Sequence, residues 1–286
     1  MIIDAHQHFW RYDPQAYAWI GAGMEVLAQD WLPGQFASVR RGNGVDASIA
    51  VQARGDEADT AFLLSLAEQD RSIAGVVGWV DLRADAVAER LSHWQAQGPL
   101  VGIRHQVQDE IDPAACLEQP AFRRGVAAVQ RAGLVYELLL RHEQLESAPA
   151  FCARHDAHAL VLDHLGKPDI GGGEAAFSLW HLQMRALAAL PHVSVKISGL
   201  LTEAPLDRDG RPDRAGVLRH LDAALELFGP GRLLFGSDWP VCRLVASYEE
   251  VLSLAQTWAQ PLSPHERQQL FGGNALDLYA GALRLP

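Results

Sequence analysis

Residues 2–9 read IIDAHQHF, and this short stretch decides between the two α/β folds that the rest of the chain allows. An open, doubly wound sheet usually carries a glycine-rich phosphate turn after its first strand. Here the first strand ends in histidines, and no GxGxxG or Walker sequence follows it. The stretch therefore favours a closed barrel over the open sheet, and no nucleotide cofactor is expected.

Apolar segments recur along the whole chain, and most are continuous rather than alternating, as is typical of parallel strands covered on both faces. Segments with helical periodicity lie between them. Eight strands alternating with eight helices over roughly 250 core residues predict an α/β fold, a (β/α)₈ barrel of the TIM type. The predicted strands are 2–8, 46–52, 74–81, 100–106, 134–140, 159–164, 193–198 and 233–238, and the predicted helices are 59–70, 85–97, 121–132, 145–155, 174–190, 214–228, 247–259 and 264–279.

The whole chain, residues 1–286, is predicted to form one domain, because no linker-like or low-complexity stretch divides it. Residues 9–32 are rich in tryptophan and tyrosine and are too long for a simple connector. On a barrel this segment would be the first βα loop, on the face where active sites lie.

Composition excludes several classes of partner. The formal net charge of −11 argues against nucleic acid or an anionic membrane surface as the main partner. No apolar run approaches the roughly 18 residues of a membrane span, and the first residues lack the features of a signal peptide. Three widely spaced cysteines form neither a disulfide framework nor a zinc-type pair, so a reducing cytoplasm is expected. Monomer and homodimer both remain open.

Alternation along the first strand predicts that Asp4, His6 and His8 share one face of it. The two histidines would lie about 6.6 Å apart along the strand, so their imidazoles could converge on one metal ion or one substrate group. Two polar residues capping the barrel core are the simpler alternative. A His-x-His pair at the end of an N-terminal strand favours a functional site.

Polar residues also end other predicted strands, and barrel enzymes carry their catalytic groups at these carboxyl ends. Asp238 ends the eighth strand, which lies beside the first strand in a closed barrel. It could ligate a metal or act as a general base, or simply cap the following segment. His164 ends the sixth strand, and Lys196 lies within an apolar seventh strand, where an unpaired ammonium would be costly.

The remaining strands offer further candidates whose roles the residues alone leave open. Glu137 of the fifth strand is either an inward carboxylate or part of a polar layer at the barrel base. Residues suited to hydrogen-bond substrate hydroxyls or a carboxylate end the second and fourth strands, namely Gln52, Arg54, Arg104 and His105.

Four motifs in this order resemble the amidohydrolase superfamily, and within it the amidohydrolase-2 branch that includes sugar lactonases of the L-fuconolactonase and L-rhamnonolactonase type. They are DAHQHFW at 4–10, DHLGKP at 163–168, KISG at 196–199 and GSDWP at 236–240. The shorter sequences QAR at 52–54, GIRH at 102–105 and WPVC at 239–242 are also similar to the L-fuconolactonase type.

The resemblance implies a barrel that hydrolyses a sugar-acid lactone to the aldonic acid. An Asp238-activated water would attack the lactone carbonyl, with His6, His8 and His164 as the other catalytic residues. One Zn²⁺ could be held by His6, His8 and Asp238, with Glu137 or a water completing the shell, and could be dispensable because a lactone is an activated ester. The implied substrate-binding residues are Gln52, Arg54, Arg104, His105, Lys196, Trp10 and Trp239.

Two departures from metal-dependent members of the superfamily argue against a binuclear centre. The fourth strand has Arg104 and His105 where a bridging lysine or glutamate is usual, and the fifth has Glu137 where a histidine ligand is usual.

Two alternatives to a lactonase stay open. One is a zinc-dependent amidohydrolase or decarboxylase acting on another small carboxylate or cyclic substrate, and the other is a non-catalytic carbohydrate-binding barrel.

Overall fold

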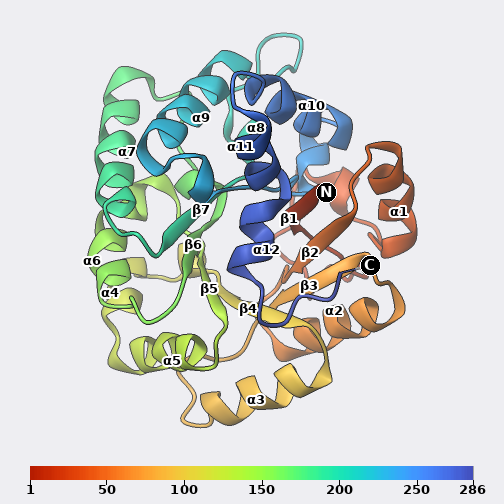
Figure 1. Ribbon diagram of the computed structural model, residues 1–286, viewed down its shortest axis with the longest axis vertical. Helices are drawn as coiled ribbons and strands as arrows, with labels where there is room; N and C mark the ends of the chain where they lie inside the picture. Colours follow the sequence, from red (N-terminus) through yellow and green to blue (C-terminus); the bar gives the residue numbers. More distant parts are fainter. Residues whose placement is uncertain (286) are drawn as a thin grey trace.

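The computed structural model describes residues 1–285, and its strands form one parallel sheet that closes into a barrel (Figure 1). Each strand pairs with the next along the chain, and a parallel bridge between Gln7 and Trp239 joins the first strand to the segment after the last. The predicted TIM barrel is thereby confirmed. The strands are β1 (Ile3–Gln7), β2 (Ala47–Val51), β3 (Ile73–Gly78), β4 (Leu100–His105), β5 (Val135–Leu138), β6 (Leu160–Leu162), β7 (Val193–Ile197) and β8 (Leu233–Phe235).

Helices surround the strands (Figure 1), and their apolar faces form the main core against the outside of the barrel. None of the helices within residues 1–285 is long and apolar enough to cross a membrane. The helices are α1 (Pro33–Gly42), α2 (Glu57–Gln69), α3 (Val87–Gln97), α4 (Pro113–Glu118), α5 (Pro120–Arg131), α6 (Ala148–Ala153), α7 (Gly173–Ala188), α8 (Leu200–Glu203), α9 (Arg214–Phe228), α10 (Tyr248–Trp258), α11 (Pro264–Gln268) and α12 (Asn274–Leu278).

Three helices, α1, α4 and α8, were not predicted, and one predicted helix is divided. Helix α1 was not predicted, because Phe36 is its only buried residue and a single apolar position gives no helical periodicity. The predicted helix 264–279 is divided into α11, a π-helical segment at Gln269–Gly273, and α12. The division falls at two adjacent glycines, and a Cβ at Gly272 would lie 2.8 Å from the carbonyl oxygen of Met1. Close packing against the N-terminus thus requires a residue that weakens a helix.

The prediction that Asp4 shares a face with the two histidines is wrong. The register between β1 and β2 shifts between Asp4 and Gln7, and such a bulge changes which side chains point inward. Asp4 accepts hydrogen bonds from the Ser237 hydroxyl at 2.6 Å and from the Tyr248 hydroxyl of the outer helix α10 at 3.1 Å. Asp4 therefore ties the barrel to a helix, while His6 faces the interior.

The barrel interior is filled by small and branched side chains of the strands, from Ile3 and Ala5 to Leu234. Tyr279, at the end of α12, joins this inner cluster, and Figure 1 shows α12 crossing in front of the strands. The C-terminal segment thus covers the end of the barrel where the strands begin. The opposite end is left for the polar residues that follow the strands.

Residues 9–32 fold into a packed lobe rather than an open loop. Trp10 and Trp31 form an antiparallel bridge, with a backbone hydrogen bond of 2.9 Å in each direction. The Trp10 indole nitrogen donates to the carbonyl oxygen of Gln29 at 2.9 Å, so this ring belongs to the interior of the lobe. Trp19 stays partly exposed at its edge.

Candidate active site

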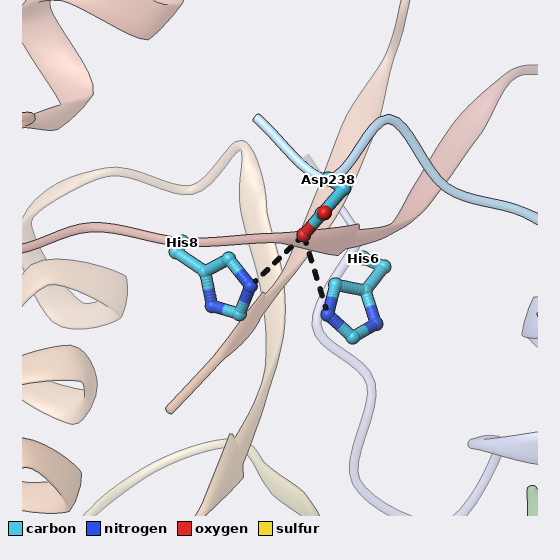
Figure 2. Close-up of side chains that lie close together, drawn as sticks. All are labelled: His6, His8 and Asp238. Atoms are coloured by element: carbon cyan, nitrogen blue, oxygen red, sulfur yellow. Dashed lines mark hydrogen bonds and ion pairs between the residues drawn. The ribbon is translucent and has the colours of Figure 1, made fainter. Parts of the chain in front are cut away.

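His6, His8 and Asp238 meet at the carboxyl end of the barrel, and Figure 2 shows one Asp238 oxygen facing a ring nitrogen of each histidine. Asp238 Oδ1 lies 3.2 Å from His8 Nε2 and 3.9 Å from His6 Nε2. All three residues are buried, and one potential ligand atom from each lies within 4.8 Å of the others. The first and last strands therefore bring together the group that the sequence predicted from their ends.

The backbone fixes this group. The amide of Asp238 donates to the carbonyl oxygen of His6 at 2.8 Å, and the amide of His8 donates to the carbonyl oxygen of Trp239 at 2.7 Å. Asp238 itself has a positive φ of 58°, which turns the chain out of the strand. A Cβ at Gly236 would lie only 2.6 Å from the Cβ of His6, so glycine makes room for that side chain.

His164 lies directly beside this group. Its ring centroid is 4.5 Å from that of His6, and its Nδ1 lies 2.9 Å from the Ser198 hydroxyl. It has a positive φ of 54°, and a Cβ at Gly199 would come within 2.7 Å of its Nδ1. Burial lowers the pKa of His164 to about 4, although Asp238 acts in the opposite direction. The ring is therefore neutral near pH 7.

A fully buried ion-pair network lies beneath the histidines. The ammonium of Lys196 is 2.5 Å from Glu137 Oε2, 3.4 Å from Asp163 Oδ1 and 3.2 Å from His6 Nδ1. The other oxygen of Glu137 accepts a hydrogen bond from the Tyr279 hydroxyl at 2.5 Å. Burial raises the pKa of Glu137 to about 7, although Lys196 opposes this. Lys196 thus connects the C-terminal segment, through Glu137, to the ring of His6.

Arg104 completes the network from the β4 side. Its Nη1 donates to Asp163 Oδ2 at 3.0 Å and lies 3.2 Å from His6 Nε2. A second nitrogen donates to the carbonyl oxygen of Gln52, and the Gln52 amide donates to the carbonyl oxygen of Arg104 at 3.1 Å. Burial alone would raise the pKa of Asp163, but Lys196, His6 and Arg104 hold it well below its ordinary value.

Asp163 was not predicted as a site residue, although it precedes His164 in the DHLGKP motif. The signal for it was an acidic residue directly after the apolar strand 160–162, where an unpaired carboxylate would be costly to bury. What the sequence does not show is which cations reach that carboxylate, because they come from β4 and β7.

A cavity of about 330 Å³ opens above Asp238, His8 and His164. Its wall combines apolar side chains with several charged ones, so it suits a small polar molecule that also has an apolar face. The lining residues are His8, Trp19, Met24, Ala53, Arg104, Gln106, Gln108, Asp109, Leu139, Arg141, His164, Lys167, Thr202, Glu203, Asp238, Val241 and Leu244.

Among the seven residues expected to bind substrate, Arg104 alone lines this cavity in the part of the chain that the structure describes. Gln52 and Lys196 have no exposed surface and serve the network beneath it. Trp10 belongs to the N-terminal lobe, and the Trp239 ring packs with its centroid 5.1 Å from that of Trp31. Residues with the expected chemistry thus serve the structure around the site.

Arg54 and His105 are also held away from the cavity. The Arg54 side chain lies 3.1 Å from a carboxylate oxygen of Asp56. His105 Nε2 lies 2.6 Å from Glu110 Oε1 on the outer side of the barrel. Cavity residues that the prediction did not name lie beyond the strands, notably Arg141 in a loop and Glu203 in the short helix α8. The conformation of the segments that follow the strands cannot be predicted from the strands alone.

The donor set fits a divalent metal ion. His8 Nδ1 lies 2.7 Å from the carbonyl oxygen of Val51, so it must carry the proton. In a neutral ring the lone pair of Nε2 then faces the carboxylate of Asp238, and this contact needs either a second proton or a cation to become favourable. Two imidazoles and one carboxylate are ligands that Zn²⁺ accepts. Glu137 does not join them, because both its oxygens are engaged deeper in the barrel.

These features define a class. The buried group of His6, His8 and Asp238, with His164 beside it, lies at the mouth of a (β/α)₈ barrel, where enzymes of this fold carry their active sites. The sequence profile described as Amidohydrolase matches residues 3–281, and the chain belongs to this family. The family expected from the motifs is confirmed.

Known relatives cover nearly the whole chain. It is 52% identical to L-fucono-1,5-lactonase of Burkholderia multivorans, over 97% of this chain and 95% of the relative. It is 32% identical to L-fucono-1,5-lactonase of Burkholderia ambifaria, over 97% of this chain and 94% of the relative. A crystal structure of an amidohydrolase from Burkholderia multivorans with bound zinc is 52% identical, with a TM-score of 0.93 and full coverage of both chains.

The buried network predicts that Lys196→Met destabilises the fold strongly. The substitution leaves Glu137 and Asp163 without their shared cation at zero exposure, which typically costs about 3–5 kcal/mol. Denaturant unfolding of the wild type and the variant measures this. The chain's other lysine is the matched control, because Lys167 is partly exposed and loosely paired, so Lys167→Met should cost less than about 1 kcal/mol. Equal losses of unfolding free energy in the two variants would contradict the role of Lys196 as the shared buried cation.

Proposed function

We propose that this chain is a sugar lactonase that hydrolyses L-fucono-1,5-lactone, or an aldonolactone of related stereochemistry, to the aldonic acid. The observation that carries the proposal is the 52% identity to an L-fucono-1,5-lactonase over nearly the full length of both chains. The buried His6–His8–Asp238 group beneath a polar cavity supplies the chemistry that ester hydrolysis needs.

Asp238 is the general base of the proposed reaction. Burial alone would raise its pKa, but the neighbouring His164, His8 and His6 hold the pKa of Asp238 well below its ordinary value. The carboxylate is therefore ionised and can take a proton from a water molecule. The water oxygen then bonds to the lactone carbonyl carbon, and the carbonyl π electrons move onto oxygen as a tetrahedral oxyanion.

Arg104 and His164 stabilise that oxyanion and the leaving group. Arg104 lines the cavity, where its positive charge favours a developing oxyanion. In the proposed reaction the Ser198 hydroxyl, 2.9 Å from His164 Nδ1, donates to that nitrogen, so that the single proton of the neutral ring lies on Nε2 as a donor. When the intermediate collapses, the ring C–O bond breaks and the alkoxide oxygen takes the proton back from Asp238. The acid formed then ionises and releases one proton to solution.

One Zn²⁺ is proposed to bind to His6, His8 and Asp238. A bound zinc ion would supply Lewis-acid polarisation of an oxygen atom in the cavity. We propose that lactone opening does not require it, because a lactone is an activated ester and Asp238, Arg104 and His164 already supply a base and two donors.

The substrate assignment is tested with a pH-indicator assay of proton release. The panel consists of L-fucono-, L-galactono-, D-arabinono- and L-rhamnono-lactone, each corrected for spontaneous hydrolysis. Hydrolysis of one stereochemical group is expected, whereas no enzymatic release from any of the four would contradict the proposal.

Asp238→Asn, which keeps the size of the side chain but removes the base, should lower kcat by about 10²- to 10⁴-fold. Near-normal turnover in that variant would remove Asp238 from the role of base.

Chelation tests the role of zinc. Dialysis against a chelator should remove about one zinc ion per chain, measured by elemental analysis, while kcat stays within about threefold of its starting value. A His6→Asn variant serves as a control, because it should no longer retain zinc. Loss of activity on chelation that zinc restores would instead favour a metal-dependent hydrolase.

The low pKa of His164, about 4, predicts the pH profile of kcat/KM. Because the neutral ring is the active form, activity should be flat above about pH 5.5 and should fall only as the pH approaches 4, where the ring gains a proton. A histidine with an ordinary pKa would lose activity near pH 6.5. A midpoint near 6.5 that disappears in His164→Gln would contradict this assignment.

A further inference from the structure

Two ion pairs on the cavity wall have no part in the proposed chemistry. Lys167 Nζ lies 3.7 Å from Glu203 Oε1, and Arg141 Nη2 lies 3.7 Å from Asp109 Oδ1. All four residues line the cavity above Asp238. Each cation at the wall thus has its own acidic partner, and the wall offers charged donors and acceptors with no excess of either charge.

The Lys167–Glu203 pair is the better enclosed of the two. The side chains of Lys167 and Glu203 are 20% and 29% exposed, against 47% and 55% for Arg141 and Asp109. A more enclosed pair is screened less by solvent and so interacts more strongly with a ligand. The comparison singles out Lys167 and Glu203.

Local backbone structure holds this pair over the reacting groups. Lys167 has a positive φ of 48°, and its amide donates to the carbonyl oxygen of His164 at 2.9 Å, which closes a tight turn. Glu203 is the last residue of α8, which follows β7 directly. One side chain therefore comes from the turn after β6 and the other from the helix after β7, and they meet at the cavity that His164 also lines. Non-glycine residues in the left-handed region cost free energy and cluster at functional sites.

Neither charged group is satisfied by the protein. Their separation of 3.7 Å is too long for a hydrogen bond, and within residues 1–285 neither the Lys167 ammonium nor the Glu203 carboxylate makes one. Burial raises the pKa of Glu203, Lys167 opposes this, and the charge of Asp238 adds to it. A partly buried carboxylate and ammonium in this state gain from a ligand that donates to one and accepts from the other.

We propose that Lys167 and Glu203 form a hydroxyl-binding pair that selects a neutral polyhydroxylated lactone. A sugar hydroxyl between them accepts a hydrogen bond from the ammonium and donates one to the carboxylate. A carboxylate-bearing substrate would instead favour cations without acidic partners. The inference rests on the proposed lactonase function and names the residues that read its substrate.

The test uses lactams, in which a ring nitrogen replaces the ring oxygen and makes hydrolysis far slower. Calorimetry measures the dissociation constants of L-fucono-1,5-lactam and of δ-valerolactam, which has no hydroxyl groups. Lys167→Met and Glu203→Gln should each raise the dissociation constant of the fucono-lactam by about tenfold or more, because each variant loses a charge-assisted hydrogen bond. Neither should change the affinity of δ-valerolactam by more than about twofold. With L-fucono-1,5-lactone as substrate, KM should rise about tenfold while kcat falls less than about threefold.

Glu174→Gln is the matched control, because Glu174 forms an exposed ion pair with Arg219 outside the cavity. It should change neither ligand's affinity. Unchanged affinity for the fucono-lactam in both variants, or an equal loss for the two lactams, would overturn the proposal. If δ-valerolactam binds too weakly for calorimetry, two other results test the proposal. They are the affinities of the variants for the fucono-lactam and the rise in KM without a comparable fall in kcat. Failure of the wild type to hydrolyse the lactone would overturn the lactonase function and this inference together.

Discussion

The ammonium of Lys196, buried between Glu137 and Asp163, is the interaction on which the site depends. The interior of a barrel is normally filled with apolar side chains, and a single charge there would be prohibitively costly. Here Arg104 and His6 complete a set of contacts that offsets the cost of burial. The same contacts determine how the His6 ring lies, so the arrangement of the reacting groups follows from the need to satisfy buried charges.

The backbone adapts to this network where the strands end. A register shift in β1 turns His6 inward and leaves Asp4 to join β1 to α10. Left-handed residues at His164 and Asp238 end β6 and β8 early and direct both side chains to the same cavity. Such conformations are unfavourable by themselves and persist where the surrounding structure determines them. Two of the residues that are proposed to do the chemistry, His164 and Asp238, therefore carry such strain.

Those same departures from regular geometry limit what the sequence could predict. Recurring apolar runs were enough for the eight strands. The position of His6, His8 and Asp238 at the ends of the first and last strands, together with barrel closure, was enough to predict that they meet. Contacts between distant side chains were not predictable in this way. Gln52, His105 and Lys196 have the chemistry of substrate ligands, yet the structure uses them to satisfy buried groups or outer loops. Glu203 was missed because the short helix α8 that carries it was not predicted.

The central claim is that Asp238 activates water and does not itself attack the lactone. A single-turnover reaction with excess enzyme in water enriched in oxygen-18 tests this directly, with the aldonate analysed by mass spectrometry. The account predicts that one labelled oxygen enters the product carboxylate in the first turnover and that Asp238 stays unlabelled. An unlabelled first product, with the label found in Asp238 instead, would show a covalent acyl intermediate on Asp238 and would contradict the account.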